Sequence, residues 1–152
     1  STLAAELAKK LGAEVIHMDD FYLPLERRQG ERIASPGWNV DYERFRAEVA
    51  RPFLDGKLPA YGAFRCDKQR ICETVAVPEA SFYIIEGCYA MHPEIPDFYD
   101  LRIVLRDTKE ACRSRILTRN GEEILRRFDG EWFPRPIPHS SARMKLRLRA
   151  TA

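Results

Sequence analysis

Apolar and polar residues follow each other along the chain with the spacing of helices in some segments and of strands in others. Residues 1–11 carry apolar side chains three and four positions apart, which predicts a helix, and Gly12 follows as a residue that commonly ends one. A second helix is expected over residues 42–54, with Asp41 as its N-cap. Pro52 lies inside this segment, and we expect it to end or kink the helix early.

Short apolar runs between polar turns predict the strands. Uninterrupted apolar strands that alternate with helices are typical of a parallel sheet covered on both faces, so the predicted fold class is α/β. We expect strands at AEVIH, SFYIIE and LRIVLR, extended pieces over residues 60–78 around a polar turn, and late helices over residues 108–119 and 122–133 on either side of an Asn-Gly pair.

Composition and charge exclude several classes of protein. The chain of 152 residues has a net charge of +2, 45% apolar residues and 32% charged residues, which is ordinary for a globular protein with one core. This balance argues against nucleic-acid and membrane partners, and no apolar run approaches the ~20 residues that span a bilayer. The four cysteines show no zinc spacing, so we interpret them as reduced thiols of a cytoplasmic protein, with a Cys66–Cys72 bridge as the alternative. Homo-oligomerisation stays open.

Two adjacent carboxylates follow the first predicted strand, in IHMDDFYLP. Ligands of parallel α/β sheets bind at the carboxyl ends of strands, and both Asp19 and Glu86 fall there. Asp19-Asp20 is either a turn or the place of a base that accepts the proton of an attacking hydroxyl, with only one of the two side chains facing a site. Glu86 is either an ordinary strand end or an acidic residue that holds Mg²⁺, directly or through water.

The first two residues allow two interpretations. Ser1-Thr2 is either a helix N-cap or the end of a P-loop, whose backbone and Lys hold phosphates and whose hydroxyl binds Mg²⁺. In the second interpretation Ser1 is the Mg²⁺ ligand. Because the chain begins without Met on a predicted helix, we expect a fragment that lacks the first strand and most of the P-loop.

Other polar and aromatic residues are candidates for binding a substrate. Asp41 can accept hydrogen bonds from a vicinal diol as well as cap a helix. Tyr22, Tyr61 and Phe64 are either packing residues or an aromatic wall for a flat base. Arginines crowd the late helices, where they form either a solvated face or a lid that neutralises charge on a transferred group. These are Arg113, Arg115, Arg119, Arg126 and Arg127.

Taken in order, the helix start ST, then HMDDFYLP, NVDYERF, YGAF, YIIEG and RSRILTRNG, make the chain resemble the uridine kinase and phosphoribulokinase-like branch of P-loop kinases. The resemblance covers residues 1–134, and residues 135–152 diverge from it as either an edge strand or a disordered tail. It implies a three-layer α/β/α P-loop NTPase with a central parallel sheet, and ATP and Mg²⁺ as cofactors. YGAFRCDKQ lacks the nearby His that reads uracil in true uridine kinases.

The resemblance also implies a role for each matching residue. Asp19 matches the general base, and Asp20 matches a less fixed neighbouring position. The other matches are Tyr22, Asp41 and Tyr61 on the substrate side, Glu86 and Ser1 at Mg²⁺, and Ser1, Thr2, Arg115 and Arg119 at ATP.

The function expected from the sequence is transfer of the ATP γ-phosphoryl group to a hydroxyl of a nucleoside-like small molecule. Within the same class the acceptor is alternatively pantothenate, glycerate or a sugar phosphate. In a different class, the chain is a non-catalytic P-loop-like module that binds a nucleotide.

Overall fold

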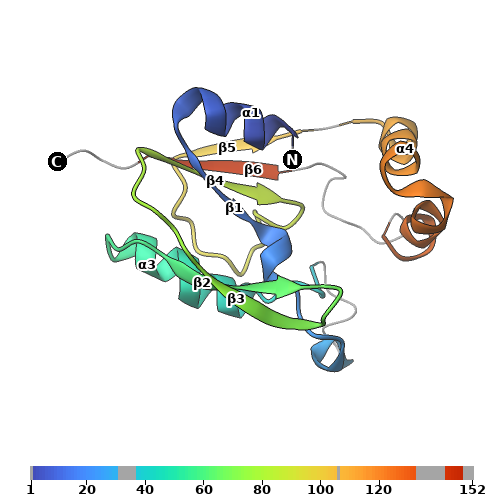
Figure 1. The fold of residues 1–152 in the computed structure, drawn as a ribbon, viewed down its shortest axis with the longest axis horizontal. Helices are drawn as coiled ribbons and strands as arrows, with labels where there is room; N and C mark the ends of the chain where they lie inside the picture. Colours follow the sequence, from blue (N-terminus) through green and yellow to red (C-terminus); the bar gives the residue numbers. More distant parts are fainter. Residues whose placement is uncertain (1, 31–36, 106, 133–142, 149–152) are drawn as a thin grey trace.

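The computed structural model describes residues 2–30, 37–105, 107–132 and 143–148. Figure 1 shows a sheet with helices on both sides and a separate helical segment, α4, at one end. The elements in chain order are α1 (Thr2–Leu11), β1 (Glu14–His17), α2 (Tyr42–Phe45), α3 (Arg51–Leu54), β2 (Ala60–Arg65), β3 (Arg70–Ala76), β4 (Phe82–Gly87), β5 (Leu101–Val104), α4 (Lys109–Arg127) and β6 (Arg143–Leu148).

The main sheet has the strand order β1-β4-β6-β5. β1 and β4 pair in parallel, whereas β6 runs antiparallel to both β4 and β5. The three strands predicted from the apolar runs therefore point the same way, and β6 runs against them between β4 and β5. The predicted parallel sheet is confirmed for these three strands, and β6 is an antiparallel strand inserted among them. Because β6 pairs along both sides, it is an interior strand and not the edge strand considered for residues 135–152.

The two faces of the sheet bury different residues. Ile84 of β4 packs under α1, against Ala4. Its neighbours Tyr83 and Ile85 join the larger core on the opposite face, which includes Phe53 of α3. This alternation follows from the period of two along a strand, and it gives the helix–sheet–helix layering of an α/β fold.

The helical segment from α2 to α3 passes through a proline. A π-helical turn, Arg46–Ala50, joins α2 to α3, and Pro52 lies in the first turn of α3. The backbone stays helical through Ala50 and Arg51, and Arg51 donates to the carbonyl of Arg46, five residues back. The missing N–H of Pro52 therefore falls next to a π-helical turn, where the regular i to i−4 bonding is already interrupted. We expected Pro52 to end or kink the helix early: it does not end the helix, and the irregularity present is the π-helical turn directly before α3. The segment ends where predicted, at Asp55 and Gly56, which has a φ of +70°.

The remaining local predictions agree with the structure. β2 and β3 form an antiparallel hairpin. α4 breaks at Gly121, whose φ of 80° and ψ of 176° are not helical, as the Asn-Gly pair predicts. All four cysteines are free thiols, so the Cys66–Cys72 bridge is excluded. Within the described residues, no helix is long and apolar enough to cross a bilayer.

Candidate functional site

The carboxyl ends of β1 and β4 bring an acid and a base together. His17 and Glu86 are partners in the parallel register, and Nδ1 of His17 lies 2.7 Å from Oε1 of Glu86. This hydrogen bond is the main reason that the pKa of Glu86 falls to about 2 and that the pKa of His17 rises. Glu86 is therefore a carboxylate at neutral pH.

The two adjacent aspartates lie on a 3₁₀ turn, Met18–Phe21, directly after β1. Each accepts a hydrogen bond from a tyrosine: Tyr22 donates to Asp19 over 3.1 Å, and Tyr61 donates to Asp20 over 3.2 Å. Asp19 is exposed. Asp20 is half-buried, and desolvation raises its pKa. Burial also raises the pKa of both tyrosines, so both stay protonated as donors.

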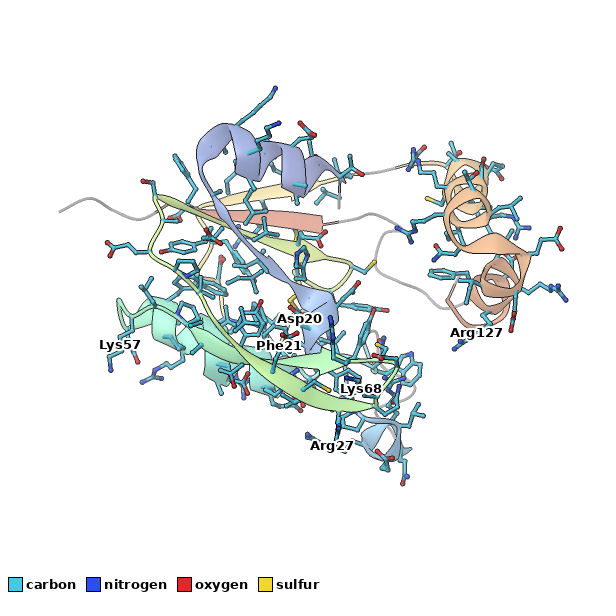
Figure 2. All side chains as sticks on the ribbon, in the orientation of Figure 1. Asp20, Phe21, Arg27, Lys57, Lys68 and Arg127 are labelled. Carbon is cyan, nitrogen blue, oxygen red and sulfur yellow. The ribbon has the colours of Figure 1, made fainter. Side chains whose placement is uncertain are left out.

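Arg44 of α2 connects the aspartate turn to the hairpin. Its guanidinium donates to the backbone carbonyl of Asp20 over 2.7 Å and to the carbonyl of Gly62 in β2. It also pairs with Glu48 at 3.3 Å and lies over the ring of Phe21, 4.6 Å from the ring centre. Figure 2 labels Asp20 and Phe21 where the turn meets the hairpin. The position of Asp20 is therefore set by contacts to its main chain as well as to its side chain.

Asp41 is buried and fully engaged within the protein. One carboxylate oxygen caps α2 by accepting from the backbone N–H of Arg44 over 3.1 Å, as predicted. The other accepts from Arg27 over 3.2 Å. The side chain of Arg27 is 59% exposed, so this partner can leave. A diol would bind Asp41 only by displacing Arg27.

Tyr22 joins the aspartate turn to a cavity. The cavity has a volume of about 500 Å³ and lies between the loop after β1, the turn of the hairpin and the end of α4. Its lining includes Tyr22, Asn39, Gln69 and Phe128. The hydroxyl of Tyr22 donates to Asp19, so one residue contacts both the carboxylate and the cavity. A volume of this size is typical of small-molecule sites.

No family model matches the chain. A search of solved structures finds the structure of a possible uridine kinase from Bacillus stearothermophilus, which is 19% identical and has a TM-score of 0.56. The match covers 86% of this chain and 74% of that chain. The two chains share a fold.

The predicted nucleotide-side residues are only partly described. Ser1 lies outside the described residues, whereas Thr2 is the exposed first residue of α1. Figure 1 shows the start of α1 on the side of the sheet toward which the arrow of β4 points, where Glu86 lies. Among the described residues there is no group of three or more His, Cys, Asp and Glu side chains placed to hold a metal.

The predicted lid arginines contact residues of their own segment. Arg115 pairs with Asp107, and Arg119 donates to Asn120 over 2.7 Å. Neither lines the cavity as described, but Arg127 near the end of α4 does. Figure 2 shows Arg127 on the separate helical segment. The structure thus brings Asp19 together with Tyr22, and within the described part of the chain neither Arg115 nor Arg119 contacts them.

Two contributors were missed by the sequence reasoning. His17 is the last residue of β1, and Glu86 is the last but one of β4. The predicted parallel pairing of these two strands was the feature that could have placed the two side chains together. Arg44 stands three residues after Asp41 in NVDYERF, where it reads as a solvated helix residue. Nothing in the sequence indicates that its guanidinium reaches Gly62 across the hairpin.

Proposed function

We propose that the chain is an ATP-dependent kinase that transfers a phosphoryl group to a hydroxyl of a nucleoside-like small molecule. The observation that carries the proposal is the placement of Asp19. It is an exposed carboxylate at the carboxyl end of β1, oriented by Tyr22, which also lines a cavity large enough for an acceptor. The fold shared with a possible uridine kinase supports the same class of reaction.

In this proposal Asp19 orients the acceptor hydroxyl and takes its proton as the oxygen attacks. Tyr22 holds the carboxylate in place through its hydrogen bond. Asp20 does not act as the base, because it is half-buried, unlike Asp19, and its carbonyl is also bound by Arg44. Its part is to keep the turn attached to the hairpin.

One observation on the described residues agrees with the binding of a nucleotide and Mg²⁺. Mg²⁺ in kinases commonly takes one or two protein carboxylates together with substrate phosphates, and Glu86 is a single ionised carboxylate at the strand end. When bound, ATP would supply the γ-phosphoryl group, and Mg²⁺ would neutralise part of its charge. The residues proposed to hold it are Glu86, Ser1 and Thr2, with Arg115 and Arg119 as the proposed lid.

The test is ADP formation by the full-length protein with ATP, Mg²⁺ and a panel of nucleosides, pantothenate and glycerate. We expect acceptor-dependent turnover, and Asp19→Asn should lower kcat by about 10²–10⁴-fold, the usual contribution of a general base. Asp20→Asn is the matched control, because it alters the neighbouring carboxylate and should cost much less. Equal losses in the two variants, or unchanged turnover in Asp19→Asn, would contradict the assignment.

A second substitution tests the nature of the acceptor. Asn is as good an N-cap as Asp, so Asp41→Asn keeps the start of α2 while it removes the charge that would grip a diol. For a ribose acceptor we expect a raised KM, together with some loss of thermal stability, because Asn gives up the ion pairs with Arg27 and Arg44. An unchanged KM would assign Asp41 to capping alone and favour an acceptor without a diol.

The alternative function is a nucleotide-binding module without catalysis. It is favoured by the engagement of both Asp41 oxygens within the protein. This alternative predicts tight ATP binding in calorimetry with no acceptor-dependent ADP formation. Asp19→Asn would then leave the affinity for ATP unchanged, and neither the wild type nor the variant would show acceptor-dependent turnover.

A further inference from the structure

The carboxylate of Asp41 has two arginine partners that differ in how firmly the protein holds them. Arg44 is nearly buried, and its Nε lies 3.8 Å from Oδ2 of Asp41. Arg27 donates to the same oxygen over 3.2 Å, but its side chain is 59% exposed. Asp41 itself is 4% exposed, and a buried carboxylate needs a charged partner. Arg44 supplies that charge from within the fold, whereas Arg27 covers the same oxygen from the surface.

The loop that carries Arg27 is held by its backbone and not by this contact. The N–H of Asp41 donates to the carbonyl of Phe21 over 2.7 Å, which joins the loop after β1 to the segment before α2. Arg27 ends a single 3₁₀ turn, and its N–H donates to the carbonyl of Pro24 over 3.0 Å. Among the residues that the structure describes, its guanidinium makes one hydrogen bond, the one to Asp41. The side chain can therefore swing away without breaking a backbone hydrogen bond.

The departure of Arg27 leaves Asp41 paired and capping. Oδ1 still accepts from the backbone N–H of Arg44, and the guanidinium of Arg44 still lies beside Oδ2. An uncharged ligand with hydroxyl donors can then bind Oδ2 without leaving a buried charge alone. Ion pairs with an exposed partner are weak and are screened by salt. Exchange of Arg27 for a ligand is therefore an easy step.

We propose that Arg27 is an autoinhibitory side chain that closes Asp41 in the free protein and leaves it when a vicinal diol binds. Because the guanidinium and the diol compete for one oxygen, the affinity for the diol is lowered by the fraction of molecules in which the contact is closed. Arg27 thus raises the KM of the acceptor, and salt strengthens the binding of an uncharged acceptor. The role of the diol rests on the proposed kinase function, whereas the weakness of the closing contact does not.

Calorimetric binding of uridine and 2′-deoxyuridine to the full-length protein tests the inference. Uridine has a vicinal diol, and 2′-deoxyuridine lacks one of its two hydroxyls. We expect Arg27→Gln to bind uridine about two- to fivefold more tightly than the wild type, the factor expected for an ion pair with an exposed partner. The affinity for 2′-deoxyuridine should change less. Weaker or unchanged uridine binding by Arg27→Gln, or no uridine binding by either protein, would overturn the inference.

Lys68→Gln is the matched control for the loss of one positive charge. Lys68 is exposed in the turn of the hairpin, and Figure 2 labels it at the same end of the molecule as Arg27. This variant should bind uridine as the wild type does. A gain in uridine affinity equal to that of Arg27→Gln would show that overall charge, and not the contact with Asp41, controls binding, and would overturn the inference.

Salt provides a second test of the competition. Between about 0.05 and 0.5 M sodium chloride, over which screening of surface charges becomes strong, uridine affinity of the wild type should rise toward that of Arg27→Gln. The variant should show little dependence on salt. A wild-type affinity that stays constant or falls over this range would overturn the inference.

Thermal unfolding tests the closing contact without any ligand. Because Arg27 is exposed, Arg27→Gln should lower Tm by no more than about 3 °C. A fall as large as that of Arg44→Met would show that the contact holds the fold together, and would overturn the inference. Uridine binding that tightens in Arg27→Gln without any ADP formation would refute the kinase proposal and leave the role of Arg27 standing. Nucleoside-dependent ADP formation with equal uridine affinities would do the reverse.

Discussion

Replacing Arg44 with methionine should destabilise the protein far more than replacing another arginine of the same helical segment. Arg44 is 12% exposed in its side chain, and its guanidinium donates to the carbonyls of Asp20 and Gly62. It also pairs with Glu48. Methionine keeps most of the aliphatic length but has no donor, so two carbonyls and a carboxylate lose their partner.

The magnitude follows from these contacts. A buried acceptor left without its donor costs about 1–3 kcal/mol, and breaking a buried ion pair by removing one partner costs about 3–5 kcal/mol. Because Glu48 also accepts from the backbone N–H of Gly62 over 2.9 Å and is 30% exposed, we expect the low end of the summed losses, about 5 kcal/mol for Arg44→Met. This corresponds to a fall in Tm of roughly 10 °C.

The assay is urea unfolding at neutral pH, followed by far-UV circular dichroism, on wild type and two variants. Arg51→Met is the control: Arg51 pairs with Asp55 at 3.2 Å, but its side chain is 74% exposed, so its loss should cost only about 0–1 kcal/mol. Free energies of unfolding for Arg44→Met and Arg51→Met within 1 kcal/mol of each other would refute the reasoning about Arg44.

Two further predictions concern the carboxyl ends of β1 and β4. The pKa of His17 is raised in the folded protein, so the pair with Glu86 stabilises the fold fully below pH 6.5, the ordinary pKa of histidine. This stabilisation is lost as the pH rises through the folded pKa of His17. The pKa of Glu86 is lowered, so the pair also stabilises the fold above pH 4.5, and that part is lost as the pH falls toward about 2. Since His17 is half-exposed, His17→Asn should cost about 1 kcal/mol at pH 5.5 and less at pH 8.5, and an equal cost at both, measured by urea unfolding, would contradict the pairing. Gly87→Ala should cost about 1–3 kcal/mol, because Gly87 has a φ of +142° and a Cβ there would lie 2.7 Å from Cβ of Met18. Gly12→Ala, with a φ of +61° and no atom within 4 Å of the added Cβ, is the milder control, and an equal fall in Tm would show that the contact with Met18 does not matter.

The local pattern of the sequence was enough to predict most elements, because those elements depend on neighbours along the chain. Asp41 caps α2 and Gly121 interrupts α4 for reasons that lie within a few residues. The direction of β6 was not predictable in this way, because an alternating strand pairs equally well in either direction, and its partners are separated from it by much of the chain.

The same distinction holds for the candidate site. The sequence indicated Asp19 and Glu86 from their positions at strand ends, and Tyr22 as one of the aromatic candidates. It gave no sign of the cavity, whose lining comes from the loop after β1, the hairpin turn and α4.

The most direct test of the central claim is the fate of the γ-phosphoryl group, followed by phosphorus NMR of a reaction of full-length protein, Mg·ATP and the best-binding nucleoside. The account predicts a phosphate monoester on a hydroxyl of the nucleoside, formed with ADP in equal amounts, and its near-complete loss with Asp19→Asn. Release of inorganic phosphate alone, at a rate that is the same with and without the nucleoside, would contradict it.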